Sequence, residues 1–184
     1  IFVFVMGGAR NYWGFNWGGT DFFYSRRIGR QPQGSIPDDV DYSDYPTGTH
    51  ILAAAKLTGK LGESWNVGTI QNVTRREFAG ISSNGTQSEI EVEPLAYYGI
   101  FRGQNEFDNG QQGLGFISTL AVRDFEDERL SDEINKSALT FGLDGWTFLD
   151  SSQTWVIAGW TGMSYLSGNE QRMVELQQSS RHYF

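Results

Sequence analysis

Hydrophobic and polar residues alternate along much of the chain from residue 50 onward. A period of two places successive side chains on opposite faces of an extended strand. In residues 50–60 the two kinds of position separate, with Ile51, Ala53, Ala55 and Leu57 on one face and Lys56, Thr58 and Lys60 on the other. Residues 65–77 repeat the alternation after a turn at 61–64. The pattern predicts a β-hairpin with arms of about ten residues, the length that a tilted strand needs to cross a bilayer.

Two further hairpins are predicted downstream. The first joins residues 94–107 to residues 113–125 through a turn that contains Asn109-Gly110. Asn-Gly between alternating segments is the strongest short-range signal for a hairpin. The second joins residues 137–148 to residues 154–166.

The connections between these hairpins lack the alternation. Residues 79–91 are polar and predict a loop, residues 126–136 predict a loop or one helical turn, and residues 170–178 predict a short helix or the start of a strand. Short turns and long connections therefore follow each other, as in an antiparallel up-and-down meander. Outer-membrane barrels share this asymmetry. We expect an all-β fold that is part of a transmembrane β-barrel, and a soluble β-barrel or sandwich is the alternative.

Composition and charge narrow the function classes. Aromatic residues make up 15% of the chain, with 23 Gly and only 4 Pro, which suits many short strands with tight turns. The mean hydropathy of -0.41 is too low for a helical membrane protein. The net charge of -8 argues against nucleic acid as a partner, because a phosphate backbone requires a basic surface. The chain contains 0 Cys, which excludes disulfides, thiolate metal sites and a cysteine nucleophile.

Residues 1–49 differ from the rest and form a separate region in the predicted organisation. We expect residues 1–49 to be a leading segment with an in-folded loop, and residues 50–184 to be the hairpin meander. Because the chain starts at Ile1 without a methionine, we expect it to be an internal fragment of a larger barrel. Trp13 and Trp17 lie in a stretch where aromatic residues occupy alternate positions. They belong either to a hairpin arm or loop whose rings pack on the sheet, or to an aromatic platform for sugars or a membrane-interface belt.

The stretch from Phe22 to Arg30 carries the most specific local signal. It joins aromatic residues to a group of arginines, and an acidic loop follows. The candidate site residues are Tyr24, Ser25, Arg26, Arg27, Gly29, Arg30, Asp38, Asp39, Asp41 and Asp44. The arginines bind either an anionic or sugar ligand, or the acidic loop as an ionic clamp. The clamp is the favoured interpretation, since the carboxylates are close in sequence.

No catalytic, cofactor or metal site is predicted. The acidic run lacks the spacing and glycine of an EF-hand loop. His50 and His182 are far apart and have no nucleophile motif beside them. A carboxylate pair for glycoside hydrolysis stays open as an alternative, because acidic residues are abundant and only their separation would test it.

Several short sequence words together resemble one protein family. They are Phe-Phe-Tyr-Ser-Arg-Arg-Ile-Gly-Arg from Phe22, Pro-Gln-Gly at 32–34, the segment 51–60, Trp65 with Val67-Gly68, Val92-Glu93-Pro94-Leu95, Phe101-Arg102, the segment 176–180, and Tyr183-Phe184. The chain resembles the DUF5916 barrel of large bacterial proteins that carry an N-terminal family 9 carbohydrate-binding-like domain. The resemblance implies a bacterial outer-membrane location, with lipid as a partner and with the missing barrel strands and the N-terminal domain supplied by the parent protein.

The predicted function is a barrel segment for the passage or docking of a glycan-like substrate, with carbohydrate as the second partner. A soluble carbohydrate-binding β-domain and a glycoside hydrolase-associated module are the alternatives. An enzymatic role is not favoured.

Overall fold

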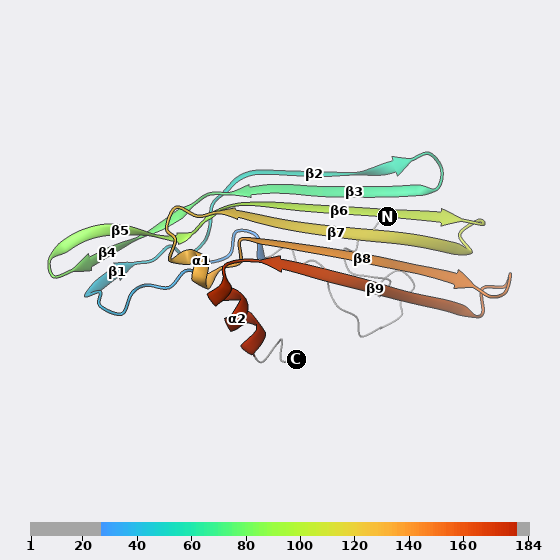
Figure 1. The fold of residues 1–184 in the computed structure, drawn as a ribbon. Coiled ribbons are helices and arrows are strands. Elements are labelled where there is room, and N and C mark those ends of the chain that lie inside the picture. Colours follow the sequence, from blue (N-terminus) through green and yellow to red (C-terminus); the bar gives the residue numbers. More distant parts are fainter. Residues whose placement is uncertain (1–26, 180–184) are drawn as a thin grey trace.

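The computed structural model describes residues 27–179, and antiparallel strands are its main elements (Figure 1). The strands are β1 (Tyr42–Asp44), β2 (Ile51–Leu61), β3 (Trp65–Thr74), β4 (Glu77–Ser83), β5 (Thr86–Glu93), β6 (Leu95–Phe107), β7 (Gln112–Asp124), β8 (Ser137–Phe148) and β9 (Val156–Ser167). The helices are α1 (Leu130–Glu133) and α2 (Glu170–Gln178). The all-β prediction is confirmed.

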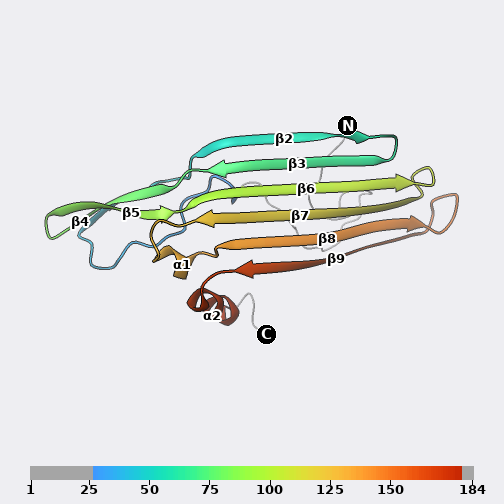
Figure 2. The same ribbon diagram turned by 45° about the horizontal axis from the view of Figure 1, so that its top comes forward.

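Most of the strands form a 6-stranded sheet in the order β2-β3-β6-β7-β8-β9. Each neighbouring pair is antiparallel, and the strands lie side by side in both ribbon views (Figure 2). The three predicted hairpins are confirmed as β2–β3, β6–β7 and β8–β9. Asp108 and Asn109 adopt φ values of 53° each and Gly110 a φ of 81°, so the turn predicted at Asn-Gly has the left-handed backbone that these residues tolerate.

The prediction of a loop at residues 79–91 is wrong. Strands β4 and β5 form a hairpin there, and β1 adds to it in a separate 3-stranded sheet in the order β1-β4-β5. The turn is Asn84-Gly85, with φ values of 50° and 75°. The segment is polar because this hairpin extends beyond the end of the larger sheet, where both of its faces meet solvent for much of their length (Figure 2). The same Asn-Gly signal that marked the β6–β7 turn was present here.

The two ends of the larger sheet differ in the length of their connections. Short turns join β2 to β3, β6 to β7 and β8 to β9 at one end, and the β4–β5 hairpin and both helices lie at the other (Figure 1). Residues 126–136 contain the single helical turn α1, and residues 170–178 are the helix α2. The side chain of Asn169 caps α2 by accepting a hydrogen bond from the Arg172 N–H at 2.9 Å.

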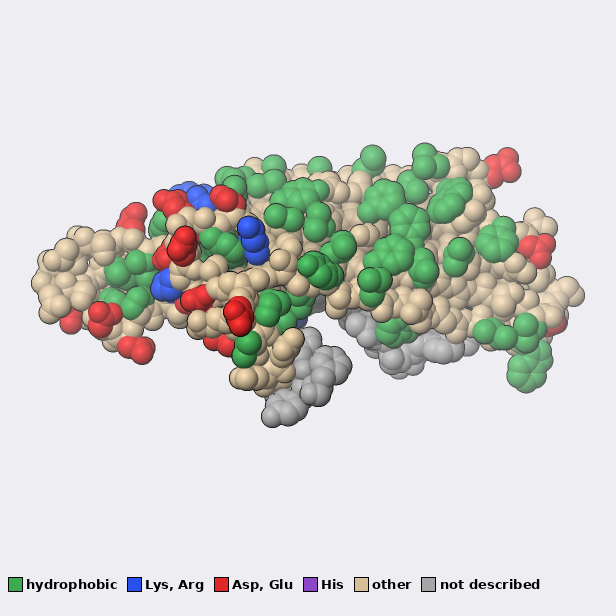
Figure 3. Space-filling view, in the orientation of Figure 1, with side chains coloured by type: hydrophobic (Ala, Val, Ile, Leu, Met, Phe, Trp, Pro, Cys, Tyr) green, Lys and Arg blue, Asp and Glu red, His purple; other side chains and the backbone are tan. Residues whose placement is uncertain are grey.

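The buried apolar residues gather mainly at the end that carries the long connections. Ala79, Val92 and Leu130 are each 0% exposed and come from β4, β5 and α1. Within residues 27–179, no layer covers the apolar face of the larger sheet, where Leu57 and Met163 are 70% and 67% exposed. Hydrophobic side chains spread over the strands in Figure 3, while charged ones concentrate near β4, β5 and α1.

The sheet has two open edges in the described part of the chain. No described strand pairs with the outer side of β2 or of β9. No helix among residues 27–179 is long and apolar enough to cross a membrane.

Candidate functional site

The residues predicted to form a site are only partly within the described range. Trp13, Trp17, Tyr24, Ser25 and Arg26 lie outside it. The side chains of Arg27 and Arg30 are exposed. Gly29 has a φ of +80°, a backbone conformation that L side chains rarely adopt.

The ionic clamp is not formed by Arg27 or Arg30. Among the described ion pairs, none joins these arginines to Asp38, Asp39, Asp41 or Asp44. The acidic loop instead accepts hydrogen bonds from neutral donors of the β4–β5 hairpin. The Asp41 carboxylate accepts the Asn84 N–H at 2.9 Å, and the Asp39 carbonyl accepts the Ser83 hydroxyl at 3.0 Å. The predicted clamp assumed that residues close in sequence would pair. The β4–β5 hairpin, which lies further along the chain, instead supplies the hydrogen-bond partners of the acidic loop.

The segment around residues 32–34 is bound to the end of β5. The contacts join two of the sequence words that resemble the family, Pro-Gln-Gly at 32–34 and Val92-Glu93-Pro94-Leu95. The Gly34 N–H donates to the Val92 carbonyl at 2.8 Å, and the Gln33 N–H donates to the Glu93 carboxylate at 2.9 Å. A Cβ at position 34 would lie 2.5 Å from Leu130 Cδ2 and 2.8 Å from the Val92 oxygen. Only glycine therefore permits this approach of the two backbones. We call residues 29–34 with Val92 and Glu93 the anchor.

Tyr45 and Thr49 complete the anchor from the other side of the loop. The Tyr45 hydroxyl donates to the Gly34 carbonyl at 2.7 Å, and the Thr49 N–H donates to the Arg30 carbonyl at 3.0 Å. Burial raises the pKa of Tyr45, and the nearby Glu93 and Glu133 carboxylates raise it further, against the opposing effect of Arg129. The loop is thus fixed by partly buried and exposed hydrogen bonds, in place of the predicted arginine–aspartate pairs.

An ionic cluster centred on Arg76 joins β5 to the end of β7. Arg76 donates to Glu91 at 2.7 Å, to Asp124 at 2.9 Å and to Glu126 at 3.0 Å. Burial acts to lower the pKa of Arg76, but its hydrogen bonds to Glu91 and Asp124 give it a net increase. The buried Glu91 also accepts the N–H groups of Glu126 and Asp127. Its hydrogen-bonding capacity is taken up by structural partners.

The larger sheet separates charge onto one face. Alternate residues of a strand share a face, and residues directly opposite in neighbouring antiparallel strands share it too. The register therefore places one set of charged side chains on the same face: Lys56, Lys60, Arg102, Glu106, Arg123 and Asp144. Asp124, the last residue of β7, is the one charged residue of these strands on the opposite face. We call the two sides the polar face and the apolar face.

A buried ion pair lies on the polar face. The Arg102 guanidinium binds the Asp144 carboxylate in bidentate fashion, with Nη2 donating to Oδ2 at 2.6 Å and Nη1 donating to Oδ1. Arg102 and Asp144 are 6% and 7% exposed. The pair crosses from β6 to β8 over Gly115, where a Cβ would lie 2.7 Å from Arg102 Nη1. Glycine in the intervening strand β7 therefore makes room for the pair.

Amide side chains extend this network along the polar face. Gln104 Nε2 donates to Glu106 at 3.1 Å, and Asn66 Nδ2 donates to the same oxygen at 3.4 Å. Arg102 Nη2 also donates to Gln104 at 3.3 Å. The network is largely satisfied by its own members, so it defines the shape and charge of this face. Arg102 was predicted only as part of a family word, although the alternation of charged positions along the strand indicates that it belongs to this face.

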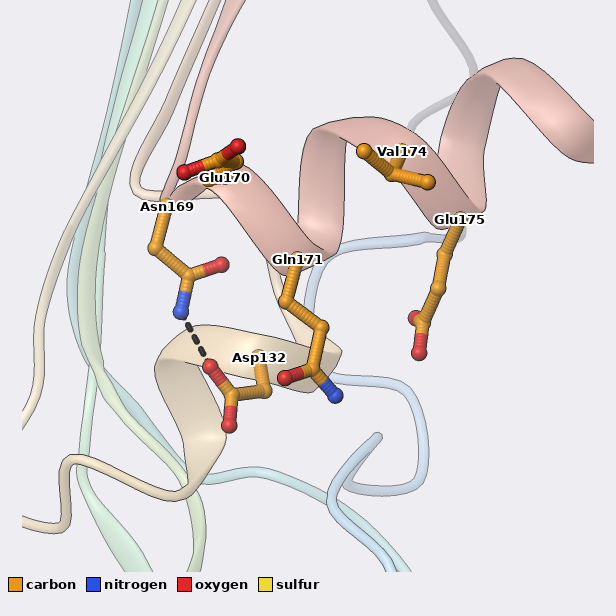
Figure 4. A pocket seen from close by; sticks show the side chains of 6 residues that line it. All are labelled: Asp132, Asn169, Glu170, Gln171, Val174 and Glu175. Atoms are coloured by element: carbon orange, nitrogen blue, oxygen red, sulfur yellow. Dashed lines mark hydrogen bonds between the residues drawn. The ribbon is translucent and has the colours of Figure 1, made fainter.

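A groove lies between α1 and α2, where Asp132, Gln171 and Glu175 are among the side chains that line it (Figure 4). Asn169 donates to the Asp132 carboxylate and so joins the two helices. The groove is open to solvent. Among residues 27–179, no group of His, Cys, Asp or Glu is placed to hold a metal ion.

These features define an antiparallel sheet with one apolar and one charged face, tied at one end by a polar anchor. The chain belongs to the family described as Domain of unknown function (DUF5916), whose profile matches residues 15–180. The resemblance inferred from the sequence words is confirmed. No curated protein and no solved structure matches the chain.

Proposed function

We propose that this chain forms part of the wall of a β-barrel in the bacterial outer membrane, and that the barrel serves the passage or docking of glycan-like solutes. The apolar face contacts lipid and the polar face lines the passage. The separation of charges between the two faces of the larger sheet carries the proposal. A soluble sheet of this size would have charges on its exposed face.

The apolar face has the composition that lipid requires. Phe101, Phe116 and Phe141 come from adjacent strands, with ring centroids 5.7 Å and 6.5 Å apart. Trp65 and Tyr165 lie on the same face, and the register places no charged residue among them. A lysine or arginine on the lipid face of a barrel costs about 2–4 kcal/mol at the middle of the bilayer. The strands contain 10 to 13 residues, which is sufficient to cross at a tilt.

The open edges support a larger barrel. Unpaired backbone groups at β2 and β9 would be costly in the hydrocarbon region, where no water replaces the missing hydrogen bonds. Strands from elsewhere in the gene product therefore pair with both edges in the proposed assembly. A carbohydrate-binding-like domain of the same product would deliver the glycan to the passage.

The side chains of the polar face suit a glycan-like solute, because charged, amide and aromatic groups lie together on it. Guanidinium, carboxylate and amide groups lie side by side on this face, which they share with Gly115 and Gly142. Trp160 lies directly opposite Asp144 and is 43% exposed. Aromatic rings beside polar groups suit sugars, which present both apolar ring faces and hydroxyls.

The test compares two neighbouring residues in the middle of β7. Leu120 lies on the apolar face and Thr119 on the polar face. Leu120→Arg in the intact gene product should lower the amount of folded protein in the outer-membrane fraction sharply, because the charge would meet lipid at a cost of about 2–4 kcal/mol. Thr119→Arg should lower it much less.

Cell fractionation, heat-modifiability on gels and the need for detergent give the measurements. Recovery of the unaltered protein as a monomer in the soluble fraction without detergent would refute the proposal. Equal losses for the two variants would refute the assignment of the faces.

A further inference from the structure

Resting on the proposed function, we propose that the polar face binds an acidic glycan, an extended sugar chain that carries carboxylate or sulfate groups. The binding surface is a diagonal row of hydrogen-bond donors: Lys56, Asn72, Tyr98 and Arg123. We call it the donor row.

The strand register brings these residues together from four neighbouring strands. Asn72 of β3 lies opposite Tyr98 of β6. Asn72 also lies opposite Ala54 of β2, so Lys56, two residues further on the same face, is its diagonal neighbour. The Arg123 guanidinium of β7 lies 5.9 Å from the centroid of the Tyr98 ring. The row thus runs without interruption from β2 to β7.

Two of its members have buried donor atoms without a partner. Asn72 is 6% exposed, and its Nδ2 makes no hydrogen bond. Arg123 Nε is also buried and makes none, although Nη1 of the same side chain donates to the Asn135 carbonyl at 2.9 Å. A buried donor without an acceptor costs free energy, and an oxygen-rich ligand would relieve that cost. The third such atom among residues 27–179, Asn105 Oδ1, belongs to the apolar face.

The charge of the donor row favours an anion. Neither Lys56 nor Arg123 forms an ion pair among the described residues. The two carboxylates of this face are engaged elsewhere, Asp144 by Arg102 and Glu106 by amide groups. The row is therefore cationic in a chain whose net charge is -8. Lysine and arginine linings are the usual means of selecting anions in pores.

The length of the row favours an extended ligand over a small ion. Neighbouring strands lie about 4.8 Å apart, so a ligand that reaches both Lys56 and Arg123 must cross three such intervals, roughly 14 Å. An oligosaccharide with regularly spaced acidic groups meets this requirement. Its hydroxyls would also serve as acceptors for Asn72 and Tyr98.

Titration of the intact gene product in detergent with two matched probes tests the inference. The probes are an oligogalacturonate and a neutral galactose oligomer of equal length, and a sulfated galactose oligomer distinguishes carboxylate from sulfate as the anion. We expect the acidic oligomers to bind more tightly than the neutral one. Lys56→Gln should weaken acidic binding by roughly two- to fivefold at low salt. Neutral binding should stay unchanged.

Arg75→Gln is the matched control, because it removes a positive charge from an exposed residue outside the strands, between β3 and β4. Asn72→Ala provides a second variant that removes an uncharged donor and should weaken acidic binding in the same direction. Equal affinity for acidic and neutral oligomers, or equal effects of Lys56→Gln and Arg75→Gln, would overturn the inference. Recovery of the protein in the soluble fraction without detergent would instead overturn the membrane proposal, whatever affinities the titration gives.

Discussion

The larger sheet and the anchored end of the molecule are both antiparallel, but different interactions hold them together. Among the ion pairs between described residues, the one that crosses the strands of the larger sheet joins Arg102 to Asp144. Around β4, β5 and α1, the described ion pairs are numerous, with Arg76 and Arg129 each binding more than one carboxylate. The sheet depends on backbone pairing and on its two contrasting faces, whereas the anchored end depends on specific polar contacts.

This difference reflects the surroundings proposed for each region. In the larger sheet, each inner strand is hydrogen-bonded to a strand on both sides. Few specific side-chain contacts are therefore needed to hold the strands in place. The anchored end joins segments far apart in sequence, such as Gly34 and Val92, with no continuous ladder to hold them. Specific hydrogen bonds and close contacts must fix their positions. Substitutions in the larger sheet should therefore affect the stability of the whole sheet. Substitutions in the anchored end should act locally.

The largest effect is expected where the sheet does depend on a side-chain pair. Asp144→Ala leaves the Arg102 charge buried without a partner, which should lower the free energy of unfolding by about 3–5 kcal/mol. Urea unfolding of the intact gene product in detergent, followed by tryptophan fluorescence, gives the value. The double variant Arg102→Met with Asp144→Leu should recover most of the loss. If the double variant were as unstable as Asp144→Ala, the ion pair would contribute stability of its own, in addition to neutralising the buried Arg102 charge.

A smaller effect is expected at the anchor. Gly34→Ala would force Leu130 and the Val92 backbone apart, and we expect a loss of about 1–3 kcal/mol. Limited proteolysis near residues 29–49 should become faster before the larger sheet is affected. Gly59→Ala is the matched control, since a Cβ there meets nothing within 4 Å. Equal proteolysis of the two variants would contradict the role of the anchor.

A weaker effect is expected from the exposed members of the Arg76 cluster. Asp124 and Glu126 side chains are 75% and 63% exposed, whereas Glu91 is 1% exposed. Glu126→Gln should change stability by no more than about 0.5 kcal/mol, because surface pairs contribute little. Glu91→Gln should cost clearly more, and chemical denaturation of both variants would rank them. The reverse order would show that exposed charges hold this end.

The smallest effect is expected from acid at the β8–β9 turn. Hydrogen bonds from Ser152 and from the Trp155 N–H lower the pKa of Asp150 to about 2. Since its pKa lies below the ordinary value of 3.8, the contribution of Asp150 to stability is complete above pH 3.8 and is lost as the pH falls through about 2. Carboxyl chemical shifts would report this titration. Asp150→Asn should remove the dependence, and an unshifted titration would contradict the hydrogen-bonded turn.

The sequence predicted the larger sheet well and the anchored end poorly. The arms of the three hairpins were confirmed within a few residues, because period-two alternation and turn chemistry are local properties. The β4–β5 hairpin was missed because its exposed position removes the alternation. The prediction of an arginine–aspartate clamp was wrong for Arg27 and Arg30, since sequence proximity says nothing about partners that other strands supply.

The candidate site shows the same limit. Charged residues at alternate positions of single strands are visible in the sequence, as with Lys56 and Lys60. Their assembly with Arg102, Asp144 and Arg123 on one face requires the register of every intervening strand. A shift by one residue in any pairing would move a whole strand's side chains to the opposite face.

The sequence was sufficient for the all-β class, for the turns of the three hairpins in the larger sheet and for the family, because each rests on the order of neighbouring residues. The tertiary structure decided which residues meet. It assigned the segment after the arginines to an anchor with Val92 and Glu93, brought Arg102 and Asp144 together over Gly115, and aligned the donor row across four strands. Those contacts depend on strand order and register, which many residues distant in sequence fix jointly.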